Sequence, residues 1–152
     1  AGTLTDKLAL IGANLLQEAL TGWLRGEITP RPQDEKAATY FPQVRKEDGE
    51  IDWHLPAAAI WRRVRAYYPW PGCYSTWQGK QLKIIEAMVL PGEGVLEAGK
   101  VSALSGREAG LGINTGEGIL RVLRVQLAGR RVVTAEDFLR GQRDFIGSVL
   151  PC

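Results

Sequence analysis

Basic side chains after residue 60 have types and spacings suited to contact with phosphate groups. Guanidinium and ammonium groups form charge-assisted hydrogen bonds with phosphate oxygens, and clusters of them bind nucleic acids. Residues 61–152 hold 13 basic against 8 acidic side chains, whereas residues 1–60 hold 6 against 9. The candidates are Arg62, Arg63, Arg65, Lys80, Lys83, Arg121, Arg124, Arg130 and Arg131. Solvated surfaces carry similar charges, so the pattern indicates nucleic-acid binding without excluding an ordinary surface.

Other chemistries find less support in the residues. His54 is the only histidine, and no nucleophile elbow accompanies it. Together with Cys73 and Cys152 it cannot complete the ligand set of a usual zinc site. The glycine-rich runs 110–112 and 116–118 complete neither a dinucleotide fingerprint nor a phosphate loop, and they are typical of turns. We therefore expect no catalytic residue, no cofactor and no metal in this chain.

Four tryptophans have two interpretations. Trp53, Trp61, Trp70 and Trp77 have rings on which unpaired bases could stack. Large rings also contribute heavily to a buried core, and we favour the core for most of them.

The elements that position these side chains begin with an amphipathic helix over residues 3–24. Apolar residues recur there at intervals of three and four, as in Leu4, Leu8, Ile11 and Leu15, and Thr3 with Asp6 resembles a capping box. So broad an apolar stripe needs a partner surface. A polar stretch with three prolines follows, which predicts an extended interdomain linker.

A second helix is predicted from Pro56 to about Tyr67, with Ile60 and Val64 on its buried face and Arg62 on the wet side. Beyond the Pro-Gly turn at residues 71–72 the pattern changes to short runs rich in β-forming residues, separated by glycines. The predicted strands are 73–77, 82–90, 100–104, 111–115 and 119–127. Five strands at this spacing favour a small barrel or sandwich.

Two local features of the last strand and helix are predicted. Arg121 and Arg124 are three residues apart and would face opposite sides of a regular strand, but a β-bulge near Val122 or Leu123 would bring them to one side. Thr134 with Asp137 caps a short final helix.

Composition limits the class of protein. With 45% apolar and 24% charged residues in 152, the chain is that of about one globular domain, and its net charge is only +2. No apolar run is long enough to span a bilayer, and no signal peptide is recognised. We expect a cytoplasmic protein with no membrane partner and with free thiols at Cys73 and Cys152.

Ordered blocks of residues resemble one known family. The blocks are residues 2–8 (GTLTDKL), 32–35 (PQDE), 38–40 (ATY), 46–53 (KEDGEIDW), 65–72 (RAYYPWPG), 115–120 (TGEGIL) and 126–131 (QLAGRR). In this order they resemble the C-terminal part of bacterial methionyl-tRNA formyltransferases over nearly the whole chain.

The resemblance implies a fold and a division into domains. The fold is mainly β with flanking helices, an OB-fold-like small β-barrel preceded by an N-terminal helix and an extended linker. Residues 1–25 would be the last helix of the truncated catalytic domain, 26–45 the linker, and 46–152 a tRNA-binding domain.

The resemblance also implies a reaction for the parent enzyme. Its donor is 10-formyltetrahydrofolate and its acceptor is the amino group of methionyl initiator tRNA, in translation initiation. Catalysis there uses an Asn, a His and an Asp of an N-terminal domain, near a Ser-Leu-Leu-Pro loop that is absent from this sequence. We therefore expect a fragment that is inactive alone and whose partners are that tRNA and the N-terminal catalytic domain.

Only three tRNA-facing positions carry over from the family. Lys46 matches a usual lysine, and Arg130 with Arg131 matches a usually basic pair. Two alternatives stay open. The chain is the C-terminal domain of a related small-molecule formyltransferase or formyl-folate hydrolase, or it is a purely structural module that braces a catalytic domain.

Overall fold

The computed structural model describes residues 1–92 and 97–151 of the chain. They divide into two compact units, Ala1–Val44 and Arg45–Cys152, and each is described by itself. Cys152 lies outside the described residues, so whether it meets Cys73 stays untested.

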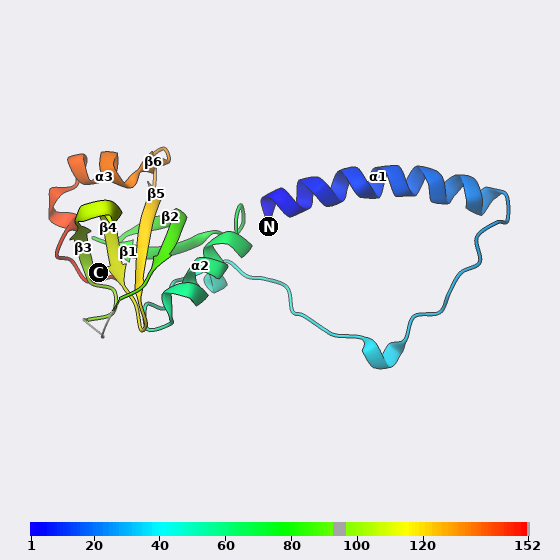
Figure 1. Cartoon of the computed structure of the whole chain (residues 1–152), viewed down its shortest axis with the longest axis horizontal. Coiled ribbons are helices and arrows are strands. Elements are labelled where there is room, and N and C mark those ends of the chain that lie inside the picture. Colours follow the sequence, from blue (N-terminus) through cyan, green and yellow to red (C-terminus); the bar gives the residue numbers. More distant parts are fainter. Residues whose placement is uncertain (93–96, 152) are drawn as a thin grey trace. The chain divides into compact units, whose positions relative to one another are not determined.

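The first unit is dominated by helix α1, Gly2–Leu24, drawn in blue in Figure 1. None of its residues is buried, and the predicted apolar stripe, including Leu4, Leu8 and Ile11, is exposed. The predicted capping box is wrong, because the helix begins one residue earlier with Ala1 as its N-cap and no side chain caps it. After the helix the unit contains only a short 3-10 turn, Glu35–Ala37, in an otherwise extended path.

The second unit is built on one antiparallel sheet, and all five predicted strands are present. Its strands are β1 (Cys73–Trp77), β2 (Lys80–Leu90), β3 (Val101–Leu104), β4 (Gly110–Asn114), β5 (Ile119–Leu127) and β6 (Val133–Thr134). The order is β1-β2-β5-β4-β3, and β6 pairs with β5. At two residues, β6 is too short to leave an alternating pattern in the sequence.

The mainly-β class is confirmed, but the described sheet does not close into a barrel, because its path ends at β1 and β3. Segments outside the sheet cover both edges. Glu50 bridges to Tyr74 on β1, and Val149 bridges to Lys100 at the start of β3. Such coverage satisfies edge hydrogen bonds that would otherwise invite pairing with another chain.

Two helices complete the core of this unit. Helix α2, Ala57–Ala66, packs on β2 through Ile60 and Val64, as predicted. Helix α3, Ala135–Gly141, begins at Thr134, whose hydroxyl accepts a hydrogen bond from the Asp137 N–H at 3.1 Å and donates to its carboxylate at 2.8 Å. The predicted cap of α3 is therefore confirmed.

The predicted bulge lies in the β2–β5 ladder. Ile84 pairs with Val125 and Ala87 with Val122, so on each strand two residues, in place of the usual one, separate these inward side chains. The alternation of β5 shifts by one at Leu123. Arg121 and Arg124 consequently lie on the same, outer side of the sheet, as the sequence suggested.

The buried thiol of Cys73 gives the unit a predicted pH dependence. Burial raises the pKa of this thiol to about 11, from an ordinary value of 9.0, against a smaller lowering by the charge of Arg63. Between these values the folded state holds a proton that the unfolded state has lost, so stability should fall as pH rises through this window. Urea unfolding at pH 7 and at alkaline pH measures it, and Cys73→Ala, which lacks the thiol, should fall less steeply. Equal slopes would contradict this account.

Candidate nucleic-acid interface

The hairpin that joins β5 to β6 carries Arg130 and Arg131. Gly129 makes its turn, with a φ of +74° that favours glycine, and the Arg130 N–H donates to the Leu127 carbonyl at 2.9 Å. The Gln126 amide donates to the Arg130 carbonyl at 3.0 Å, which ties the hairpin to the sheet. Both arginines are exposed, and no described residue forms an ion pair with either guanidinium group.

The two acidic side chains of α3 are both paired with one arginine of the same helix. Arg140 donates to Glu136 at 2.6 Å and to Asp137 at 2.9 Å. These carboxylates are thus engaged by Arg140, so the positive charge of the hairpin is left available to an anion.

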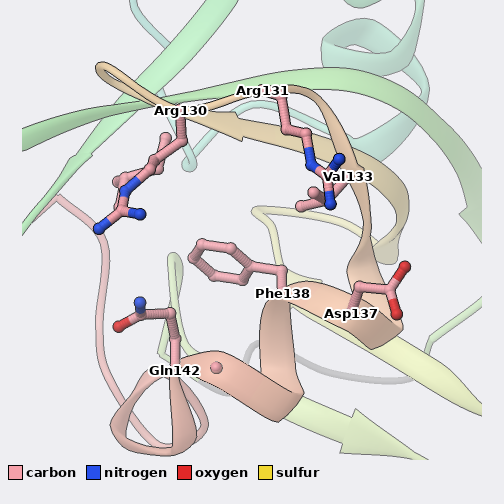
Figure 2. A pocket seen from close by; sticks show the side chains of 8 residues that line it. Arg130, Arg131, Val133, Asp137, Phe138 and Gln142 are labelled. Carbon is pink, nitrogen blue, oxygen red and sulfur yellow. The ribbon is translucent and has the colours of Figure 1, made fainter.

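A pocket of about 300 Å³ lies between the hairpin and α3. Figure 2 shows Arg130 and Arg131 on its hairpin side, Asp137 and Gln142 on its helix side, and the Phe138 ring at its floor. The lining residues are Leu127, Arg130, Arg131, Val133, Asp137, Phe138, Gly141 and Gln142. Cationic groups thus stand over an apolar floor.

Sequence reasoning found the two arginines but missed the rest of the pocket. Phe138 and Gln142 are four residues apart in the sequence, a spacing that puts side chains on one side of a helix. In the structure Gln142 follows the last residue of α3, Gly141, with a non-helical backbone. That spacing was the available signal. It identifies a face of α3 without saying that the face meets the hairpin.

The outer face of the sheet carries a second group of basic side chains. Strand alternation puts Lys83 there, opposite Tyr74 on β1 and Gln126 on β5. The bulge adds Arg121 and Arg124, although Arg121 donates to the Ala109 carbonyl at 2.9 Å and Arg124 lies opposite the acidic Glu86. This face is therefore only partly available to phosphate.

Acidic residues lie at the β1 edge of this face. The pKa of the Tyr74 phenol is raised, first by burial and then by the carboxylates of Glu50 and Glu47. The positive region thus gives way to negative charge at β1.

The remaining candidates lie elsewhere. Lys80 is three residues before Lys83 on a regular part of β2, so it points to the opposite face, the side on which Leu127 lines the pocket. On α2, Arg62 is opposite the buried stripe. The nine predicted basic residues therefore do not form one continuous basic surface.

Two further candidates lie beside acidic side chains. Arg63 contributes charge at Cys73 and Asp52, which places it next to the acidic segment before α2. Lys46 is directly followed by the 3-10 turn Glu47–Gly49, whose first two residues are acidic. Both cations thus have local anionic neighbours.

Most of the four candidate tryptophans are at least half-buried, as expected, and one is exposed. Trp53 and Trp77 are buried, and the Trp53 indole N–H donates to the Ser75 hydroxyl at 3.1 Å. Trp61 is half-buried, with the Arg65 guanidinium 4.5 Å from its ring centroid. Only Trp70 among the four is exposed to solvent.

His54 forms a pair with Asp52 at the surface. The His54 backbone N–H donates to Asp52 at 2.9 Å, and the Nδ1 atom lies 3.1 Å from the same oxygen. The backbone hydrogen bond, followed by the ring contact, lowers the pKa of Asp52. Neither a cysteine nor a serine is recorded as a partner of this histidine among the described residues. In the part of the chain that the structure describes, no group of three or more His, Cys, Asp or Glu residues is arranged to hold a metal ion.

Comparison with protein families gives a match over most of the second unit. The model of the formyl transferase C-terminal domain matches residues 43–143. None of the described helices is long and apolar enough to cross a membrane.

Comparison with curated proteins finds relatives that are about twice as long. Methionyl-tRNA formyltransferase from Chloroflexus aurantiacus is 47% identical over 141 residues, which cover 93% of this chain and 45% of that protein. The protein of that name from Bacillus pumilus is 41% identical over 149 residues, covering 98% of this chain and 47% of its own. The chain thus spans about half the length of these relatives.

Solved structures share the fold. A variant of HypX from Aquifex aeolicus is 24% identical with a TM-score of 0.62, covering 86% of this chain and 24% of that one. HypX in complex with tetrahydrofolic acid is 25% identical with a TM-score of 0.60, over 84% of this chain and 22% of that one.

Proposed function

The chain belongs to the family of formyl transferase C-terminal domains, and from that premise we propose that it is the tRNA-holding portion of a methionyl-tRNA formyltransferase. Its relatives of that name, at 41–47% identity, support the parent enzyme. The observation that carries the binding role is the exposed Arg130–Arg131 pair, to which no described carboxylate is bound.

The proposed parent reaction takes place elsewhere in the whole enzyme. There the formyl group passes from 10-formyltetrahydrofolate to the amino group of methionyl initiator tRNA, in the cytoplasm and at the start of translation. This chain supplies no reacting group in the proposal. Its contribution is to hold the tRNA so that the acceptor end reaches the catalytic domain.

The exposed stripe of α1 supports a second part of the proposal. Leu8, Ile11 and Leu15 are each more than half exposed, and burying such side chains stabilises a contact by about 1.5–3 kcal/mol each. We propose that this stripe packs against the N-terminal catalytic domain of the parent enzyme. Residues 26–45 then act as the linker to the tRNA-holding unit.

Contacts of this kind act mainly through phosphate charge. They position an RNA largely without reading its sequence, because every nucleotide presents the same phosphate. The candidate contacts are the hairpin pair, Lys80 on the pocket side, and Lys83 with Arg124 on the outer face. Lys46, Arg62, Arg63 and Arg121 are weaker candidates, because they lie apart from the hairpin or, as with Arg121, are engaged elsewhere.

Salt dependence tests the binding role. If the chain neutralises about three or four phosphates, the logarithm of the tRNA association constant should fall against the logarithm of salt concentration with a slope of roughly −2 to −4. Filter binding of methionyl initiator tRNA over a salt series measures this slope. A slope near zero, or no binding at low salt, would overturn the electrostatic account.

The likeness to HypX favours a second candidate function. That protein has a solved complex with tetrahydrofolic acid, so a similar fold also occurs in a protein that binds a small molecule. In this candidate the chain is a structural module of a small-molecule formyltransferase. A gel shift with tRNA at two salt concentrations separates the two, since a structural module should shift no tRNA at either.

A further inference from the structure

We propose that the pocket between the β5–β6 hairpin and α3 holds one unpaired nucleotide of the bound RNA. The base lies against the apolar floor, and Arg130 and Arg131 hold the phosphates on either side of it. This inference rests on the proposed function, because it names which part of an RNA the same surface takes.

The size of the pocket selects the ligand class. Its volume of about 300 Å³ is at the low end of the range of about 300–1,000 Å³ for small-molecule sites. One base with its ribose fills such a space, whereas a dinucleotide cofactor needs a longer cleft. The pocket is also partly open to solvent, so a nucleotide can enter while its neighbours stay outside.

The floor is apolar and held in place. Leu127, Val133 and Phe138 form it, and Phe138 is only 6% exposed. The Phe138 ring packs edge-on against Trp77 and Phe145, with centroids 5.9 and 5.1 Å away. These two contacts keep the ring from collapsing into the pocket, so little ordering is needed when a flat base binds.

The rim supplies the polar groups that a nucleotide needs. The guanidinium groups of Arg130 and Arg131 can bind phosphate and can also stack on a base. Gln142 offers an amide, which is both donor and acceptor, to the edge of a base. The Asp137 carboxylate accepts from Arg140 at 2.9 Å and from Thr134 at 2.8 Å, so it is already engaged by donors on its own helix and at that helix's N-cap.

The shape of the site requires the base to be unpaired. A base inside a duplex is stacked on both faces and hydrogen-bonded at its edge, so it cannot reach a floor recessed behind two arginines. Loops, bulges and ends of RNA present bases that are free to enter. The pocket therefore distinguishes unpaired from paired nucleotides of an RNA, whereas the basic side chains around it do not.

Gly141 allows a direct test of the pocket. It lines the pocket, its φ is not in the left-handed region, and a Cβ built on it would meet no atom within 4 Å. Gly141→Phe adds a ring at a position that lines the pocket while leaving every charge of the chain in place. Gly141→Ala is the matched control, since it makes the same backbone change without filling the space.

The experiment measures fluorescence anisotropy of labelled hexauridylate and of a blunt RNA duplex, using the full chain. We expect Gly141→Phe to weaken hexauridylate binding by roughly tenfold, because stacking contributes about 1–3 kcal/mol per base. Gly141→Ala should leave it unchanged, and neither variant should alter duplex binding. Equal hexauridylate affinity in both variants would overturn the inference.

A second measurement keeps the test independent of whether the Phe variant folds. Amide chemical shifts of the wild-type chain are followed on addition of uridine monophosphate or inorganic phosphate. The nucleotide should move the signals of Val133, Phe138 and Gln142, and phosphate should move only those of the two arginines. The same shifts with both would mean that an anion alone binds, which overturns the inference. If the wild-type chain bound neither the duplex nor tRNA, this would instead contradict the proposed function.

Discussion

Replacing Trp53 with alanine is expected to lower the free energy of unfolding of the Arg45–Cys152 unit by about 3–5 kcal/mol. The side chain is 2% exposed and belongs to the main core. Its removal leaves a large cavity and takes the indole partner from the buried Ser75 hydroxyl. The loss should be among the largest that one substitution can cause in this unit.

The backbone around Trp53 explains why the effect spreads. The Ile51 N–H donates to the Tyr74 carbonyl at 2.8 Å, and the Gly116 N–H donates to the Trp53 carbonyl at 2.9 Å. The segment before α2 is therefore attached to β1 and to the turn after β4, with Trp53 between these attachments. A cavity at this point loosens both attachments.

Urea denaturation followed by circular dichroism measures the change. Trp70→Ala is the matched control, because Trp70 is 60% exposed and its removal should change stability by less than about 1 kcal/mol. Similar losses for the two variants would show that Trp53 does not anchor the core.

Changing Arg130 and Arg131 together to alanine is expected to weaken tRNA binding by about 1–2 kcal/mol and to reduce the magnitude of the salt slope by about 2. The two guanidinium groups are exposed, and no ion pair with a described carboxylate competes for them. If the proposed phosphate contacts are made, the loss should be similar for initiator and elongator tRNAs, because every nucleotide presents the same phosphate.

Matched controls separate a phosphate contact from net charge. Lys100→Ala with Arg107→Ala removes the same charge near β3, an end strand that β4 separates from β5, and should leave binding nearly unchanged. Replacing Arg130 and Arg131 by lysine should retain the salt slope. An equal loss for both double-alanine variants would show that only the total charge matters, against a contact at the hairpin.

Most of the fold could be predicted from local patterns. The strands at 73–77 and 119–127 were predicted with the bounds that the structure has, because the alternation of β-forming residues is sufficient where turns separate the runs. The expected barrel does not close. Two local features, β6 with its two residues and the N-cap of α1, were missed or wrong. In both cases too few residues carry the signal.

The candidate site could be predicted less completely. The sequence named Arg130 and Arg131, but it treated Lys80 and Lys83 as neighbours on one surface, although regular alternation sends them to opposite faces. It gave no indication of the acidic neighbours of Arg63 or of the capture of Arg121 by a backbone carbonyl. The sequence thus identified the basic residues, but not the faces of the fold on which they lie or the groups beside them.

The residue types and their order were sufficient to predict the family, the strands and the cap of α3. The strand patterns and the cap each depend on residues within a few positions of the chain. The sides taken by Arg121 and Arg124 required the register of β2 against β5, where one bulge reverses all later side chains. The pocket required Phe138 to pack against Trp77, sixty-one positions away in the chain. Contacts at such separation form only when the sheet and α3 come together, and the folded chain alone shows where they lie.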